Sequence, residues 1–145
     1  VSSNLKNGIN VLLVEDNKTN QILISSLLIR EKYQFDIVKN GWEAICAFEA
    51  CKYDLILMDI NMPVINGEEA TKAIRKTNKQ IPIIALTADD ICGQLFEDKL
   101  YMGFNDVISK PFNNEVFMTT IRNLIKLTRR SLPEESGFDR LTLAS

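Results

Sequence analysis

Side chains with carboxylate, hydroxyl and ammonium groups follow directly after four short apolar runs in this chain of 145 residues. Glu15 and Asp16 follow Val11–Val14, Asp59 follows Leu55–Met58, Thr87 follows Ile83–Leu86, and Lys110 follows Val107–Ser109. Short apolar runs of this kind favour buried strands of a parallel sheet, whose carboxyl ends share one edge. We therefore expect these side chains at a single edge, where open α/β sheets bind ligands.

The chemistry of this set points to a hard metal ion and to phosphorus. Three neighbouring carboxylates repel one another, and their ionised forms persist only with a cation between them. Oxygen ligands without His or Cys suit a hard divalent ion, and a site with room for water and phosphate oxygens suits Mg²⁺ best. With the ammonium of Lys110 and the hydroxyl of Thr87 beside it, the carboxylate of Asp59 could act as a nucleophile towards phosphorus.

Each residue also has a plainer interpretation when it is taken alone. Glu15 and Asp16 could favour the positive end of a following helix, and Asp59 could begin a turn. Thr87 could be a helix N-cap and Lys110 an ordinary surface lysine. Their joint placement at the ends of four strands favours a common site over separate explanations.

The elements that position these residues alternate between strands and helices. We predict strands within 9–14, 35–38, 55–59, 83–87 and 107–109, and helices over 18–33, 42–50, 68–76, from about 91 to 102, and 114–127. Such alternation with short loops implies right-handed βαβ crossovers. We expect a three-layer (βα)5 α/β fold with a doubly wound parallel sheet. By analogy with flavodoxin-like folds, the strand order would be 2-1-3-4-5.

Apolar spacing predicts which helix faces the core covers. The first helix, capped by Asn17, pairs Leu23 with Leu27 and Ile24 with Leu28 at a spacing of four residues. The second helix would turn Ala44, Ile45 and Phe48 inward. For the last helix, the predicted inward residues are Phe117, Ile121, Leu124 and Ile125.

Length and apolar pattern indicate one domain, over residues 9–127. Residues 1–8 resemble a disordered lead-in and 128–145 a linker or tail, and the absence of an initiator Met at Val1 suggests a processed or excised piece. No apolar run reaches the ~18 residues that span a bilayer, so we expect a cytoplasmic domain, even if a parent protein is membrane-bound.

Composition excludes several classes of function. The chain contains no histidine, which rules out Ser-His-Asp and Cys-His catalysis within it and the usual zinc sites. Cys46, Cys51 and Cys92 lack metal-ligand spacing and are expected as reduced thiols. A net charge of −2 argues against a broad nucleic-acid surface.

The motifs together resemble the receiver domain of two-component response regulators. The matching stretches are residues 11–17 (VLLVEDN), 57–63 (LMDINMP) with Gly67, 85–88 (ALTA) and 109–112 (SKPF). Residues 15–21 (EDNKTNQ) further resemble receivers fused to hybrid histidine kinases. The resemblance covers about residues 9–127 and is specific as a set.

The resemblance implies a role for each site residue. Asp59 would be the phosphoacceptor, and Glu15 and Asp16 would hold Mg²⁺ directly or through water, together with Asp59 and the backbone carbonyl of Asn61. Thr87 would bond the phosphoryl group and Lys110 would pair with its charge. In this family the Lys110-Pro111 bond is often cis.

The resemblance also implies how such a domain works. The domain would be a signalling module rather than an enzyme, catalysing only its own phosphorylation and dephosphorylation, although a parent chain could be a kinase. The partner would be a histidine kinase or a histidine phosphotransfer domain, in a phosphorelay, with the receiver as a monomer or weak dimer.

Val107 departs from the family pattern. The family usually has an aromatic residue three positions before the lysine, and this residue rotates inward when the threonine moves. We therefore expect phosphorylation to move Thr87 and the loop after it, with little side-chain swing at Val107.

Two other functions remain open at this point. A Mg²⁺-dependent aspartyl phosphohydrolase would need a second acid two residues after its nucleophile, where this chain has Asn61. A non-phosphorylatable interaction module of the same fold would not need the complete set of site residues that the chain carries.

Overall fold

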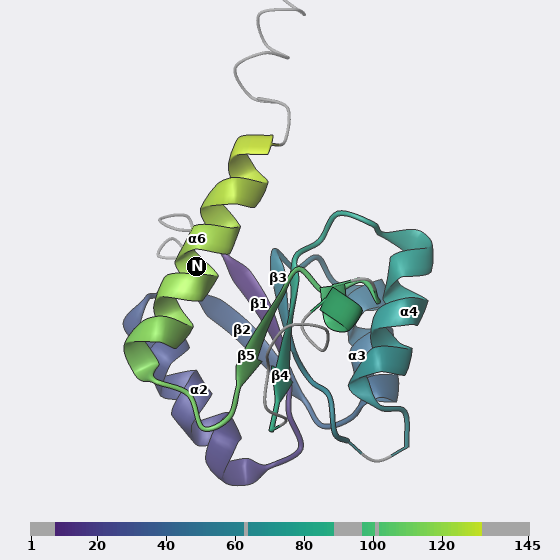
Figure 1. The fold of residues 1–145 in the computed structure, drawn as a ribbon, viewed down its shortest axis with the longest axis horizontal. Helices are drawn as coiled ribbons and strands as arrows, with labels where there is room; N and C mark the ends of the chain where they lie inside the picture. Colours follow the sequence, from purple (N-terminus) through teal and green to yellow (C-terminus); the bar gives the residue numbers. More distant parts are fainter. Residues whose placement is uncertain (1–7, 63, 89–96, 101, 132–145) are drawn as a thin grey trace, which may run out of the picture.

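Five parallel strands form the single sheet of this protein, in the order β2-β1-β3-β4-β5 (Figure 1). The computed structural model describes residues 8–62, 64–88, 97–100 and 102–131. The strands are β1 (Asn10–Val14), β2 (Gln34–Val38), β3 (Leu55–Asp59), β4 (Ile83–Thr87) and β5 (Asp106–Ser109). The predicted fold class and strand order are therefore confirmed.

Burial follows the position of each strand in the sheet. In β3 and β4 every residue is buried, and in β1 all but the first. The edge strands β2 and β5 are largely half-buried or exposed. Continuous apolar runs are the pattern expected of central strands that helices cover on both faces.

Helices cover both faces of the sheet. Helices α2 (Lys18–Arg30) and α6 (Asn114–Ser131) lie on one face, and α3 (Gly41–Ala50) and α4 (Gly67–Thr77) lie on the other (Figure 1). Alternate strand residues point to opposite faces. Leu13 and Leu57 thus join the core under α2 and α6, whereas Leu12 and Ile56 join the core under α3 and α4.

The first helix differs from its prediction at two points. It ends at Arg30 rather than near Tyr33, because the chain turns at Lys32, whose φ is 66°, and begins β2 at Gln34. Leu23 is 37% exposed, although its spacing suggested an inward position. The buried residues of α2 are Ile24, Leu27 and Leu28, because only a narrow stripe of the helix contacts the sheet.

Asparagine side chains cap the other helices on the far face. Asn40 caps α3 and Asn66 caps α4, where Glu69 completes a capping box. Each of these helices begins one residue earlier than predicted, at a glycine. In the last helix, Phe117, Ile121 and Ile125 are buried as expected, but α6 continues four residues beyond the predicted end at Leu127.

Several predicted features lie wholly or partly outside the described residues. These are the lead-in over 1–7, the tail over 132–145, Cys92, and much of the helix predicted after Asp90. Residues 97–100 of that helix are helical, and Gly103 follows with a φ of 116°. Cys46 and Cys51 are exposed free thiols. Within the described ranges, no helix has both the length and the apolar character needed to cross a bilayer.

Candidate functional site

The ends of four strands bring the predicted site residues to one edge of the sheet. Val14 is paired with Met58, and Asp59 is paired with Leu86 in the adjoining strand. Thr87 is in turn paired with Ser109, which directly precedes Lys110. Because the strands are parallel and in this register, β1 brings Glu15 and Asp16 to one side of Asp59, and β4 and β5 bring Thr87 and Lys110 to the other.

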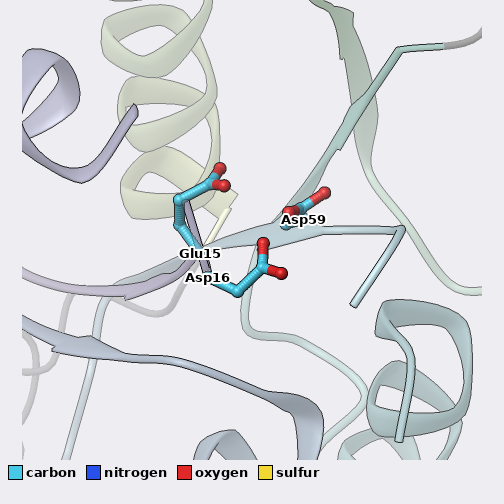
Figure 2. Close-up of side chains that lie close together, drawn as sticks. All are labelled: Glu15, Asp16 and Asp59. Carbon is cyan, nitrogen blue, oxygen red and sulfur yellow. The ribbon is translucent and has the colours of Figure 1, made fainter. Parts of the chain in front are cut away.

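Three carboxylates converge at this edge. One oxygen each from Glu15, Asp16 and Asp59 lies within 4.8 Å of the other two. Glu15 and Asp59 are buried, whereas Asp16 is exposed. Figure 2 shows the three side chains gathered where β1 and β3 end. The cluster is therefore buried on its inner side and open to solvent through Asp16.

Lys110 supplies the positive charge within this group. Its Nζ lies 3.2 Å from Glu15 Oε1 and 3.2 Å from Asp59 Oδ1. The backbone amide of Lys110 donates a hydrogen bond to the carbonyl of Thr87 at 2.7 Å, which fixes the start of the side chain. The Lys110-Pro111 peptide bond is cis, as the resemblance implies. One ammonium against three carboxylates leaves an excess of negative charge.

This environment raises the pKa of Asp59 to about 7. Burial of the carboxyl group is the largest cause, and the charge of Glu15 is the second, while Lys110 opposes both. The backbone amide of Asn61 also contacts this carboxylate, donating to Asp59 Oδ1 at 3.2 Å. A cation between the carboxylates would favour the ionised form. The oxygen-only donor set fits a hard divalent cation such as Mg²⁺.

The first turn of α2 holds Glu15 in position, a role that sequence reasoning missed. The backbone amide of Asn17 and the side-chain amide of Asn20 donate to Glu15 Oε2, at 3.2 and 3.4 Å. The side chain of Gln21 donates to the carbonyl of Glu15 at 2.7 Å. Polar residues directly follow the acidic pair in the sequence, but their pattern predicts only the N-cap at Asn17 and the resemblance to receivers of hybrid histidine kinases, not these contacts with Glu15.

Gly67 brings the start of α4 against the backbone of Asp59. A Cβ atom at this position would lie 2.3 Å from the carbonyl oxygen of Asp59, so only glycine fits. The amide of Gly67 also donates to the carbonyl of Ile60 at 3.1 Å. The end of β3 and the first turn of α4 therefore form one tightly packed corner beneath the carboxylate.

The remaining predicted residues lie near this corner in different settings. Thr87 is buried at the end of β4, and Asn61 is exposed just beyond β3. Val107 is half-buried in β5 and packs against the core under α3 and α4. The metal-binding role of the Asn61 carbonyl and the switching role of Thr87 and Val107 stay predictions.

Comparisons with known proteins agree with this geometry. The family model of the response regulator receiver domain matches residues 11–122. Hybrid signal transduction histidine kinase I of Dictyostelium discoideum is 40% identical over 124 residues, covering 79% of this chain and 7% of that protein. The chain spans between 6% and 56% of the length of eight curated relatives.

Solved structures of receiver domains share the fold. The receiver domain of the sensor histidine kinase PA1611 from Pseudomonas aeruginosa was solved with magnesium coordinated in its active site cleft. It is 38% identical with a TM-score of 0.74, covering 81% of this chain and 98% of that one. A Saccharomyces cerevisiae structure of the Ssk1 receiver domain with the histidine phosphotransfer protein Ypd1 matches at 36% identity and a TM-score of 0.72. That match covers 78% of this chain and 86% of the matched chain. This chain thus belongs to the response regulator receiver domain family, the signalling domains of two-component systems.

Proposed function

We propose that Asp59 accepts a phosphoryl group from a phosphohistidine, in a reaction that needs Mg²⁺. The observation that supports this most directly is the position of Lys110 Nζ, 3.2 Å from both Glu15 and Asp59 at the solvent-open edge of the sheet. A nucleophilic carboxylate, a fixed ammonium and two further carboxylates provide the positioning and charge neutralisation that phosphoryl transfer requires.

In the proposed step, a carboxylate oxygen of Asp59 attacks the phosphorus of the donor. The new P–O bond forms as the P–N bond to the donor imidazole breaks, and the departing nitrogen takes the electron pair of that bond. Lys110 and the hydroxyl of Thr87 would stabilise the phosphoryl oxygens. No oxidant or reductant is required.

Glu15, Asp16, Asp59 and the backbone carbonyl of Asn61 would hold the metal ion. When bound, Mg²⁺ would neutralise charge on the phosphoryl oxygens. Asn17 and Asn20 keep the Glu15 carboxylate in place through their contacts with Oε2. The raised pKa of Asp59 supports the same assignment, because a cation would offset the repulsion by Glu15 that contributes to it.

The donor would be a histidine kinase or a histidine phosphotransfer domain, because this chain contains no histidine. The receiver would work in the cytoplasm as a monomer or weak dimer, without nucleic-acid or membrane contact of its own. It would also catalyse its own dephosphorylation. Phosphorylation would move Thr87 and the loop after it, with little movement of the Val107 side chain. A comparison of backbone positions with and without a phosphoryl mimic tests this, and an unmoved loop over 87–90 would contradict it.

Intact mass spectrometry tests the central proposal. The protein is incubated with acetyl phosphate or phosphoramidate and Mg²⁺, beside an Asp59→Asn variant and a metal-free sample. We expect one acid-labile phosphoryl adduct on the wild-type protein with Mg²⁺ and none in either control. Absence of an adduct with both donors would instead favour an interaction module that is not phosphorylated. Continuous release of phosphate from many substrates would favour a phosphohydrolase.

A further inference from the structure

A partly buried ion pair connects α4 to the segment that follows β4 along the chain. Lys99 Nζ lies 2.6 Å from Glu68 Oε2, and the two side chains are 8% and 27% exposed. Lysine is seldom buried, and a buried ammonium is tolerated when a charged partner compensates for its lost hydration. Figure 1 shows the short helical turn of residues 97–100, in green, beside α4.

The pair links the two sides of the candidate site. Glu68 directly follows Gly67, whose backbone packs on the carbonyl of Asp59. Lys99 belongs to the segment that leaves the sheet after Thr87. The ion pair therefore connects the corner that carries Asp59 to the chain beyond Thr87, by a path separate from the hydrogen bonds between β3 and β4.

A second polar contact holds the other end of the same segment. Arg75 Nε donates to the carbonyl of Gly103 at 2.9 Å, and Arg75 Nη2 donates to Asn105 Oδ1 at 2.8 Å. Glu68 and Arg75 lie two helical turns apart on one face of α4. Between them, the buried hydroxyl of Thr71 has no hydrogen-bond partner among the described residues. This face of α4 thus holds Lys99 through Glu68, and Gly103 and Asn105 through Arg75.

A pocket adjoins the ion pair between Glu68 and Lys99. A pocket of about 420 Å³ is lined by residues that include Asn61, Glu68 and Lys99. Both charged side chains of the pair line this pocket, so water in it can reach the ion pair. The pocket also reaches Asn61, whose backbone amide donates to the Asp59 carboxylate.

From this arrangement we propose that the Glu68–Lys99 pair is a latch that opposes the phosphorylated conformation. The latch holds the helical turn of residues 97–100 against α4 in the resting state, and the contact breaks when Thr87 moves towards a phosphorylated Asp59, while Arg75 keeps its contacts with Gly103 and Asn105. This inference rests on the proposed function of Asp59. A ligand of one state gains affinity when the competing state loses a stabilising contact.

The affinity of the protein for a phosphoryl mimic reports how strongly the Glu68–Lys99 contact opposes the phosphorylated conformation. Beryllofluoride with Mg²⁺ is titrated into the wild-type protein, Glu68→Gln, Lys99→Gln and the double variant, and binding is followed by NMR. Each single variant should bind about fivefold more tightly, at the low end of typical allosteric couplings, and the double variant should bind no tighter than either single one. The reversed pair, Glu68→Lys with Lys99→Glu, should restore wild-type affinity. Glu97→Gln and Lys72→Gln, at exposed positions on the same two elements, should leave affinity unchanged.

Two further measurements keep the test decisive. If Lys99→Gln does not fold, the apolar pair Glu68→Leu with Lys99→Met replaces it, because such exchanges of buried ion pairs often preserve stability. The ¹H–¹⁵N signal of the Lys99 ammonium should shift when the mimic binds to the wild-type protein.

The outcomes separate the latch from the proposed function. Unchanged or weakened binding in folded variants would overturn the latch, while binding and phosphorylation of the wild-type protein would still support Asp59 as phosphoacceptor. A wild-type protein that neither binds the mimic nor accepts a phosphoryl group would overturn both.

Discussion

Replacing Asp59 with Asn should stabilise the metal-free protein at pH 8 and leave its stability almost unchanged near pH 4. The carboxyl group is 3% exposed, and its pKa is raised from 3.8 to about 7, first by burial and then by the charge of Glu15. The folded state therefore binds this proton more tightly than the unfolded state does. Between about pH 4 and 7 the free energy of unfolding falls as pH rises, because the folded protein must ionise a buried group.

The magnitude follows from the size of the pKa change. The pKa difference between 3.8 and about 7, at about 1.4 kcal/mol for each unit, gives an upper bound of about 4.5 kcal/mol. Solvent reaches the open side of the cluster and screens the charges, so we expect a measured effect of about 1–3 kcal/mol. Asn keeps the shape of the side chain but cannot ionise, so it removes this penalty at high pH.

Urea unfolding followed by circular dichroism, without metal and from pH 4 to 8, measures the difference between the variant and the wild-type protein. Glu49→Gln, at an exposed position on α3, is the matched control for the loss of one carboxylate. The stabilisation by Asp59→Asn should grow with pH, whereas that of the control should not. An Asn variant that is equally or less stable than the wild-type protein at pH 8 would refute the proposed cause of the raised pKa.

Four other changes have defined outcomes. Lys110→Ala should lower the rate of phosphorylation by acetyl phosphate by about 100-fold, which single-turnover mass spectrometry measures. At pH 8 it should also lower the free energy of unfolding by about 2–4 kcal/mol, because Glu15 and Asp59 lose their shared cation, and urea unfolding measures this loss. Gly67→Ala should cost about 1–3 kcal/mol in unfolding free energy, because its Cβ would collide with the carbonyl of Asp59, and an unchanged urea midpoint would contradict this. Asn66→Ala should cost about 1 kcal/mol through loss of the capping box on α4, which thermal unfolding detects. Mg²⁺ at about 100 times its Kd should stabilise the wild-type protein by about 2.7 kcal/mol at pH 8, and an equal gain in Asp59→Asn would argue against binding at this cluster.

Most of the architecture could be predicted from local patterns. The apolar runs of β1, β3 and β4 are long enough for central strands and too short for helices, so their alternation with helices indicated the fold class. The predicted N-cap at Asn17 located the start of α2, and the predicted starts of α3 and α4 each lay within one residue of the observed ones. The ends of helices and the limits of their buried faces were predicted less accurately, because they depend on how far the sheet extends beneath the helix. Leu23 is exposed and α2 ends at Arg30, both in contrast to the prediction.

The sequence by itself determined which side chains meet at the candidate site, because residues that end parallel strands of one sheet must share an edge. Only the tertiary structure decided their environment. Three features depend on distances between strands that are far apart in the chain. They are the burial of Glu15 beside an exposed Asp16, the raised pKa of Asp59, and the contact of Lys110 with both Glu15 and Asp59. The contact of Glu68 with Lys99, 31 residues away, likewise has no local signal, because either residue alone matches an ordinary solvent-exposed charge.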